Sequence, residues 1–270
     1  MSNSLKLSSL LAIILFSSFV LFKPAEKPTL FLIGDSTVKN GKGDGAGGLW
    51  GWGSFIGEYF DAKKITVKNE ALGGTSTRTF MHRGRWQAVL PQIKKGDYVI
   101  MQFGHNDSSP LDDSARARGT IKSNGDESQE IYNPITKQRE LVYSYGWYLR
   151  KFVSDIKAKG AIPIICSHIP RNDWENGKVV RNTADYGEWA REAARQSGAF
   201  FIDLNQLIAD EYDQQGEAKV RATYFNTKDR THPIEAGSRL NAKMVVRGIK
   251  RVEGLPLKKY LTKQAKKEIN

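Results

Sequence analysis

Short apolar runs alternate with longer amphipathic stretches along the chain from Thr29 onward. A parallel sheet whose strands are joined by crossover helices produces this alternation. The apolar runs are continuous, as expected for strands that are covered on both faces. They predict strands at Thr29–Ile33, Thr66–Asn69, Tyr98–Phe103, Ile162–Cys166 and Phe200–Asp203. We therefore predict an α/β fold, a three-layer α/β/α sandwich around a central parallel sheet.

The amphipathic stretches predict four helices. They span Trp52–Phe60, Leu141–Ala158, Thr183–Gln196 and Ile234–Val252. In the second helix, apolar residues recur at spacings of three and four, which places them on one buried stripe. This stripe comprises Val142, Tyr145, Tyr148, Leu149, Phe152 and Ile156. We assign it to the core rather than to a ligand site.

A long polar segment runs from Asn106 to Arg139, directly after the third predicted strand, and is rich in Ser, Asp, Asn and Gly. Structureless loops of this length are uncommon in compact domains and are usually functional or mobile. No repeat or sharp linker divides the chain between residues 29 and 246. We expect one domain with two appended termini.

The N-terminal segment, residues 1–28, is typical of a secretory signal. Lys6 precedes an apolar run, Leu10–Phe22, that is broken only by two serines. Its 13 residues fall short of the roughly 20 needed to cross a bilayer as a helix. We expect export to the periplasm or the extracellular space. No clear cleavage site follows, so an uncleaved N-terminal anchor is the alternative.

The composition narrows the class of protein. The chain has 270 residues, 40% of them hydrophobic, with 41 Lys and Arg against 29 Asp and Glu, which gives a net charge of +12. These values are typical of a globular protein. The single cysteine, Cys166, excludes an intramolecular disulfide and a Cys-rich zinc site. The basic excess favours an anionic partner, but residues 247–270, with eight basic and two acidic residues, carry half of it. We expect this basic tail to be solvated.

Polar motifs follow three of the predicted strands and precede the last predicted helix. Ligands of open parallel sheets bind outside the carboxyl ends of the strands, where these motifs lie. They are Gly34-Asp35-Ser36-Thr37, Gly73-Gly74-Thr75-Ser76, Gly104-His105-Asn106-Asp107 and Asp229-Arg230-Thr231-His232-Pro233. Each motif alone is also typical of a turn or a helix cap.

The combination indicates a nucleophilic hydrolase. A serine nucleophile needs a base within hydrogen-bond distance, and the base needs a third group that fixes its tautomer. Asp229, three residues before His232, can return its carboxylate to the imidazole. Backbone amides and an Asn side chain can stabilise the oxyanion of acyl transfer.

The four motifs, in this order, resemble the four blocks of the SGNH (GDSL-type) hydrolase family. Three segments are similar to the rhamnogalacturonan acetylesterases within it: Gly34-Asp35-Ser36-Thr37, Asn69-Glu70-Ala71 leading to Gly74-x-Ser76, and Ile169-Pro170-Arg171-Asn172-Asp173-Trp174. The similarity extends roughly from Pro28 to Val246 in block order and spacing. It implies a flavodoxin-like SGNH fold, with residues 29–246 as the catalytic domain.

The resemblance also implies the roles of the site residues. Ser36 is the nucleophile, His232 the general base and Asp229 its orienting partner. The amides of Ser36 and Gly74 and the side chain of Asn106 form the oxyanion hole. The mechanism needs no cofactor, and no His, Asp and Glu spacing resembles a metal site. His105 is expected to be structural.

The substrate implied by the resemblance is acetylated rhamnogalacturonan, an anionic pectic polymer. Its acetyl groups on galacturonate leave through an acetyl-enzyme. Candidate substrate-binding residues are Arg78, Arg83 and Arg85 for the carboxylates and Trp86 and Trp174 for the sugar rings. The alternative is that the arginines are solvated and the tryptophans belong to the core.

Two other functions remain open. The same site suits an acetylesterase acting on xylan or another neutral glycan. A polyanion-binding protein would use the basic charge but would not need a serine, histidine and aspartate together. Basic charge without aromatic interleaving is a weak nucleic-acid signal. We therefore expect an acetylated acidic polysaccharide as partner, no nucleic acid, no membrane span beyond the possible anchor, and a monomer.

Overall fold

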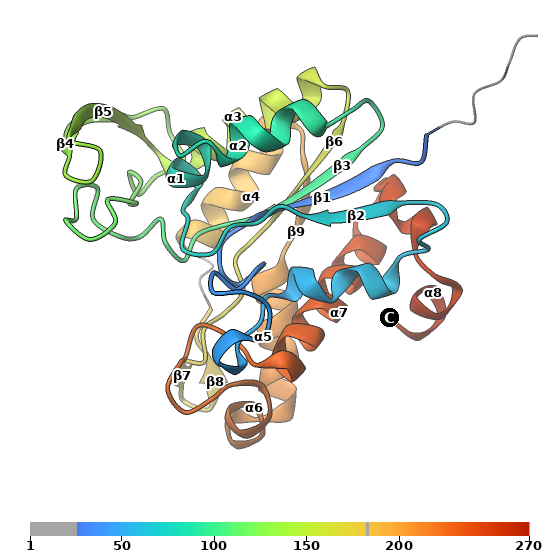
Figure 1. The fold of residues 1–270 in the computed structure, drawn as a ribbon. Coiled ribbons are helices and arrows are strands. Elements are labelled where there is room, and N and C mark those ends of the chain that lie inside the picture. Colours follow the sequence, from blue (N-terminus) through green and yellow to red (C-terminus); the bar gives the residue numbers. More distant parts are fainter. Residues whose placement is uncertain (1–25, 182–183, 270) are drawn as a thin grey trace, which may run out of the picture.

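Five parallel strands form the central sheet of the computed structural model, which describes residues 26–181 and 184–269 (Figure 1). Their order across the sheet is β2-β1-β3-β6-β9. The strands are β1 (Thr29–Gly34), β2 (Thr66–Asn69), β3 (Tyr98–Gln102), β6 (Ile162–Cys166) and β9 (Phe200–Ile202). All five lie where the apolar runs predict them, within one residue at each end.

The direction of chain progression reverses beside β1, because the chain places β2 on one side of it and β3 on the other. In open α/β sheets, ligands bind at such a switch point, outside the carboxyl ends of the strands. Gly34 at the end of β1 is in register with Gln102 at the end of β3. The motifs that contain Ser36 and Asn106 therefore leave the sheet next to each other.

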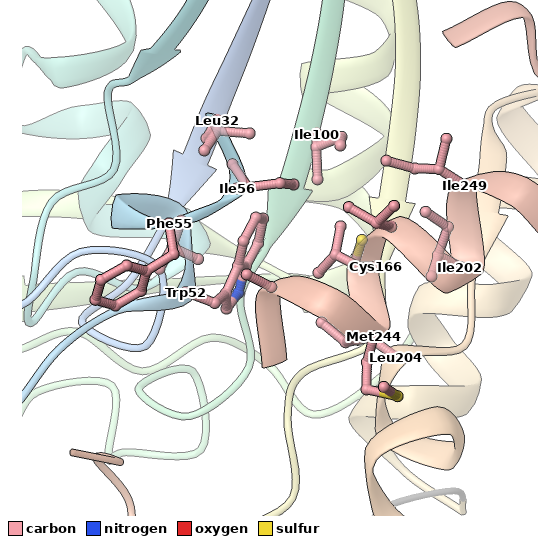
Figure 2. Close-up of a cluster of buried hydrophobic side chains, with 14 of the residues drawn as sticks. Leu32, Trp52, Phe55, Ile56, Ile100, Cys166, Ile202, Leu204, Met244 and Ile249 are labelled. Atoms are coloured by element: carbon pink, nitrogen blue, oxygen red, sulfur yellow. The ribbon is translucent and has the colours of Figure 1, made fainter. Parts of the chain in front are cut away.

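Alternate strand residues enter two separate cores, since successive side chains of a strand point to opposite faces. Leu30 and Leu32 of β1 pack with Trp52 and with apolar residues of α5 (Leu204–Gln215) and α7 (Glu235–Arg251). Figure 2 shows part of this core, a cluster that includes Leu32, Trp52 and Met244.

Phe31 and Ile33 face the other core, formed by α1 (Thr77–His82), α2 (Arg85–Val89), α3 (Tyr145–Ala158) and α4 (Tyr186–Ser197). Helices cover both faces of the sheet, so the predicted three-layer α/β/α sandwich is confirmed.

Two of the four predicted helices differ from the prediction, one in its type and the other in where it begins. Trp52–Phe60 is two 3₁₀ turns, Trp52–Ser54 and Ile56–Tyr59. Gly53 lets these turns pack closely on the sheet end, because a Cβ there would lie 2.5 Å from the side-chain amide nitrogen of Asn69 and 2.7 Å from the carbonyl oxygen of Val38. The helix predicted from Leu141 begins at Tyr145, since the side chain of Ser144 accepts a hydrogen bond from the Trp147 amide and caps it. Val142 is buried, but it lies on a strand, Gln138–Tyr143, rather than on the helix.

The other two helices form close to their predicted bounds. The helix predicted over Thr183–Gln196 is α4, which begins at Tyr186 after a turn at residues 184 and 185 and ends at Ser197; residue 183 lies outside the described residues. The helix predicted over Ile234–Val252 is α7, which begins and ends one residue inside those bounds. The amphipathic pattern missed α5 and four short helices, which are α1, α2, α6 (Glu217–Tyr224) and α8 (Lys263–Glu268).

The polar segment after β3 is not wholly irregular. Its second half forms an antiparallel hairpin of β4 (Ser128–Asn133) and β5 (Gln138–Tyr143), which projects from the body (Figure 1). A second small hairpin joins β7 (Trp174–Glu175) to β8 (Lys178–Val179). The expectation of one long loop therefore holds only for the residues that precede β4.

The expectation of a solvated C-terminal tail is wrong for its apolar residues. After α7, a 3₁₀ turn (Pro256–Tyr260) and α8 bring them into the core. The Leu261 region pairs with the Phe60 region, and the Thr262 amide donates to the Tyr59 carbonyl at 2.9 Å. The buried residues are Leu255, Leu257, Leu261, Ala265 and Ile269. The tail keeps its lysines at the surface while closing one side of the fold.

The predicted signal segment lies outside the described residues up to position 25. Across the described ranges, every helix is too short or too polar to span a membrane.

Candidate active site

Ser36 lies on a tight turn immediately after β1. The amide of Val38 donates to the carbonyl of Asp35 at 3.1 Å, which closes the turn. Gly34 permits it, because a Cβ there would lie 2.5 Å from the carbonyl oxygen of Gln102. The Asp35 carboxyl beneath the turn is fully buried, and burial raises its pKa. The turn thus presents the Ser36 hydroxyl beyond the end of the strand.

Ser36, His232 and Asp229 form a continuous hydrogen-bonded chain. The Oγ atom of Ser36 lies 2.7 Å from Nε2 of His232, and Nδ1 of His232 lies 2.8 Å from Oδ2 of Asp229. The other oxygen of Asp229 accepts hydrogen bonds from the amides of Thr231 at 2.8 Å and His232 at 2.9 Å. With Nδ1 donating to the carboxylate, Nε2 is free to accept the serine proton.

The Asp229 carboxyl is kept ionised. Partial burial acts to raise its pKa, but hydrogen bonds from His232 and the Thr231 amide outweigh this effect and lower it. The negative carboxylate fixes the imidazole orientation and can stabilise the imidazolium formed when a serine is deprotonated.

The three predicted oxyanion donors lie around the same cavity as Ser36. The amides of Ser36 and Gly74 make no hydrogen bond with any other described residue. Asn106 uses one hydrogen of its amide nitrogen, donating to the Thr75 carbonyl at 2.7 Å. Gly74 has φ +82°, a value that favours glycine. The structure therefore brings together all the residues predicted for the chemistry.

The cavity is strongly cationic. Its volume is about 730 Å³, and Ser36 and His232 open onto it. Asp229 is its one acidic residue among the described lining residues, and this carboxylate is engaged with His232. The cationic lining residues are Lys42, Arg83, Arg116, Arg118 and Arg171. An anionic ligand would be attracted to this cavity.

Of the five candidate substrate-binding residues, Arg83 lines the cavity and the other four do not. The prediction of a substrate contact is wrong for Arg78, whose side chain is 0% exposed and makes two hydrogen bonds of 2.7 Å to Glu140. It is also wrong for Trp86, which is buried in the core and donates to Asp155.

Arg85 and Trp174 are also held by protein groups. Arg85 donates to the carbonyl and the carboxylate of Glu70. Trp174 is half-buried against the core and donates to Asn172 at 2.8 Å. The alternative of a core role describes Trp174 better than substrate contact does, whereas Arg85 is paired with Glu70 and is neither solvated nor in the cavity.

Sequence reasoning missed Lys42, Arg116, Arg118 and Arg171 as cavity residues. Arg116 and Arg118 belong to the polar segment after β3, which had no assigned role, and Arg171 lies in a stretch noted only for its family resemblance. The one available signal was the density of basic residues within segments that follow strand ends.

His105 also lines the cavity. Its ring packs edge to face on that of His168, with centroids 4.9 Å apart. Burial holds the pKa of His105 well below its usual range, and the nearby His168 and Arg171 act in the same direction. Within the ranges that the structure describes, no group of three His, Cys, Asp or Glu residues is placed to hold a metal ion.

Comparisons with known proteins agree with this site. The model of the GDSL-like lipase/acylhydrolase family matches residues 32–240. The chain is 32% identical over 239 residues to the probable rhamnogalacturonan acetylesterase YesY of Bacillus subtilis, covering 87% of this chain and 98% of that protein. It is 30% identical over 251 residues to the rhamnogalacturonan acetylesterase of Emericella nidulans, covering 93% and 96%.

A solved structure shares the fold. The acetylxylan esterase Axe2 of Geobacillus stearothermophilus superposes with a TM-score of 0.54 at 22% identity, covering 82% of this chain and 94% of that one. The resemblance to SGNH hydrolases is thus confirmed by sequence and by fold. The chain belongs to the GDSL-like lipase/acylhydrolase family and is an esterase.

Proposed function

We propose that this esterase removes acetyl groups from the galacturonate residues of rhamnogalacturonan. The observation that carries the proposal is the hydrogen-bonded chain from Ser36 through His232 to Asp229, opening onto a cavity lined by five cations. Relatives named rhamnogalacturonan acetylesterases, at about 30% identity over most of the chain, support a carbohydrate acetylesterase.

The reaction follows from the geometry. Oγ of Ser36 attacks the acetyl carbonyl carbon while Nε2 of His232 takes its proton. The negative oxygen of the tetrahedral intermediate accepts hydrogen bonds from the amides of Ser36 and Gly74 and from the side chain of Asn106. The bond to the sugar oxygen then breaks, and His232 protonates this departing oxygen, which leaves as a hydroxyl.

A water molecule completes the cycle. His232 removes a proton from it as its oxygen attacks the acetyl-enzyme. A second tetrahedral intermediate forms at the same donors. Its bond to Oγ breaks, the proton held by His232 returns to Ser36, and acetic acid leaves and ionises to acetate.

The charge of the cavity favours a uronate over a neutral glycan. Arginine guanidinium groups bind carboxylates with paired hydrogen bonds in a fixed plane. Four of the five cations that line the cavity are arginines, which a neutral xylan chain would leave without counter-charges. We therefore place acetylated xylan second as a substrate.

The test is acetate release from acetylated rhamnogalacturonan, acetylated pectin and acetylated xylan, measured side by side. We expect the highest kcat/KM on rhamnogalacturonan, and a rising KM as salt screens the cavity charge. Ser36→Ala should lose at least about 10³-fold in kcat, because loss of a nucleophile removes most triad catalysis. Equal or faster release from xylan would refute the substrate, and activity retained by Ser36→Ala would refute the nucleophile.

We also propose that the protein is exported, on the basis of residues 1–28. Export would place the enzyme where polysaccharide is accessible. Cell fractionation tests this proposal, and an enzyme found only in the cytoplasm would contradict it.

A further inference from the structure

Arg118 contacts Gly74, which lines the cavity together with Ser36. Its Nη1 atom donates to the carbonyl oxygen of Gly74 at 3.2 Å, and its Nε atom donates to Oγ of Ser109 at 3.2 Å. The two bonds use different nitrogens of one planar guanidinium, so they fix its orientation as well as its position.

The glycine needs such support. Gly74 has no side chain to pack and adopts φ +82°, and glycine backbones are the most freely moving in unfolded and loop states. The next carbonyl along, that of Thr75, accepts a hydrogen bond from Asn106 at 2.7 Å. The carbonyls of Gly74 and Thr75 are therefore held by two side chains, those of Arg118 and Asn106, which both belong to the polar segment after β3.

The backbone around Arg118 is itself tightly fixed. Ala117 is fully buried and has φ +42°, a left-handed conformation that is unfavourable for alanine. Asp113 holds this turn, since its side chain accepts from the Arg116 amide at 2.8 Å and its carbonyl accepts from the Ala117 amide at 3.0 Å. On the other side, a Cβ on Gly119 would lie 1.9 Å from the Ser109 carbonyl.

The buried alanine lies between two arginines that line the cavity. Arg116 and Arg118 flank Ala117 in the sequence, and both line the cavity. A strained residue persists only where the surrounding structure determines it, and such strain is concentrated at functional sites. The backbone next to Arg118, whose guanidinium donates to Gly74, is therefore held in one conformation.

We propose that Arg118 is a positioning residue that holds the Gly74 amide in place for oxyanion stabilisation. The inference rests on the proposed function, because the Gly74 amide matters only if Ser36 attacks an ester. Arg118 acts through Gly74 and need not touch the substrate.

The test uses the full chain and a small neutral ester, 4-nitrophenyl acetate, so that binding of a uronate does not contribute. Arg118→Ala should lower kcat about 10- to 100-fold, since loss of one oxyanion donor costs about 10²–10³-fold and Gly74 is displaced rather than removed. KM should stay within about threefold of the wild-type value. Arg118→Lys should recover part of kcat, because one ammonium can still reach a carbonyl but lacks the two-point geometry.

A second measurement separates positioning from general stability. A boronic acid forms an anionic tetrahedral adduct with a nucleophilic serine, and its inhibition constant should rise in parallel with the loss of kcat in the Arg118 variants. Rates are normalised to the active sites titrated with a phosphonate. Arg139→Ala is the matched control, an exposed arginine on the β4–β5 hairpin, and should change kcat less than twofold.

Three results would overturn the inference. The first is a kcat per active site that is unchanged in both Arg118→Ala and Arg118→Lys, which would make the residue merely structural. The second is a higher KM with unchanged kcat, which would make it a binding residue. The third is a lower kcat with unchanged boronic acid affinity. If Arg118→Ala does not fold, Arg118→Lys decides by the same criteria.

The proposed function fails in a different way. A wild-type enzyme that hydrolyses 4-nitrophenyl acetate but not acetylated rhamnogalacturonan refutes the substrate, and the Arg118 comparison still applies. Esterase activity that survives in Ser36→Ala removes the nucleophile and the inference together.

Discussion

Replacing Glu140 by Gln should destabilise the fold without changing substrate binding. The Glu140 carboxylate accepts two hydrogen bonds of 2.7 Å from Arg78, whose side chain is 0% exposed, and it is itself 17% exposed. Gln keeps the shape and one acceptor oxygen but leaves the buried guanidinium without a counter-charge. Breaking a buried ion pair from one side costs about 3–5 kcal/mol, so with the carbonyls of Leu111 and Gly119 still bound to Arg78 we expect about 2–4 kcal/mol.

This loss is large enough to measure by thermal unfolding. A change of 1 kcal/mol shifts Tm by roughly 2–4 °C in chains of this size, so Tm should fall by roughly 4–16 °C at pH 7. The matched control is Glu130→Gln on the same hairpin, whose partner Arg139 has an 80% exposed side chain. Exposed pairs contribute about 0–1 kcal/mol, so the control should shift Tm by no more than a few degrees.

The pH dependence gives a second readout. Burial acts to raise the pKa of Glu140, but hydrogen bonds from Arg78 and Asn133 outweigh it and the folded-state pKa is lowered. The stabilisation is therefore present at neutral pH and is lost as the pH falls through that lowered value. In Glu140→Gln this loss should be absent, so the Tm values of the wild type and of the variant should converge at acid pH.

Two outcomes would refute this reasoning. An unchanged Tm in Glu140→Gln would mean that the buried pair contributes nothing to stability. A raised KM on acetylated rhamnogalacturonan, with unchanged Tm, would return Arg78 to the substrate-binding residues.

Three further predictions concern the site itself. Asp229→Asn should lower kcat by about 10⁴-fold with little change in KM, because the imidazole loses its fixed tautomer, and a loss below tenfold in steady-state assays would contradict this role. Arg83→Ala should raise KM on acetylated rhamnogalacturonan about threefold or more at low salt and less at 0.5 M salt, while KM for 4-nitrophenyl acetate stays constant. Burial raises the pKa of Asp107 to about 7, so its contribution to stability is present in acid and is lost as the pH rises toward 7. Asp107→Asn should flatten the dependence of Tm on pH between about 4 and 7, and an unchanged slope would show that this carboxyl is not perturbed.

The sequence predicted those features that depend on neighbouring residues. The five strands are buried on both faces, so their apolar runs are continuous and easy to identify. Ser36, Asn106 and His232 lie in short motifs at strand or helix ends, where the direction of the chain is nearly fixed. The distant parts of the site therefore converge because the parallel sheet brings its carboxyl ends together.

The sequence alone did not predict the direction in which the arginine side chains point. Arg78 and Arg118 both follow strand ends and both carry the charge expected for a uronate site. Arg78 is buried against Glu140, 62 residues away on the hairpin, whereas Arg118 lines the cavity beside Ala117, whose backbone is left-handed. Neither arrangement leaves a periodic signal in the sequence. Likewise, the hairpin strands are mostly exposed and polar, so they lack the alternation that predicts a strand.

The buried C-terminal residues determine where the expressed chain can be truncated. Leu257, Leu261, Ala265 and Ile269 recur at every fourth position and are each at most 3% exposed. Burying a leucine or isoleucine contributes about 1.5–3 kcal/mol, so three such side chains supply about 5–9 kcal/mol, comparable to the whole stability of a typical domain. An expression clone that stops at residue 246, the predicted end of the catalytic domain, would therefore yield an insoluble or protease-sensitive product despite containing Ser36, Asp229 and His232.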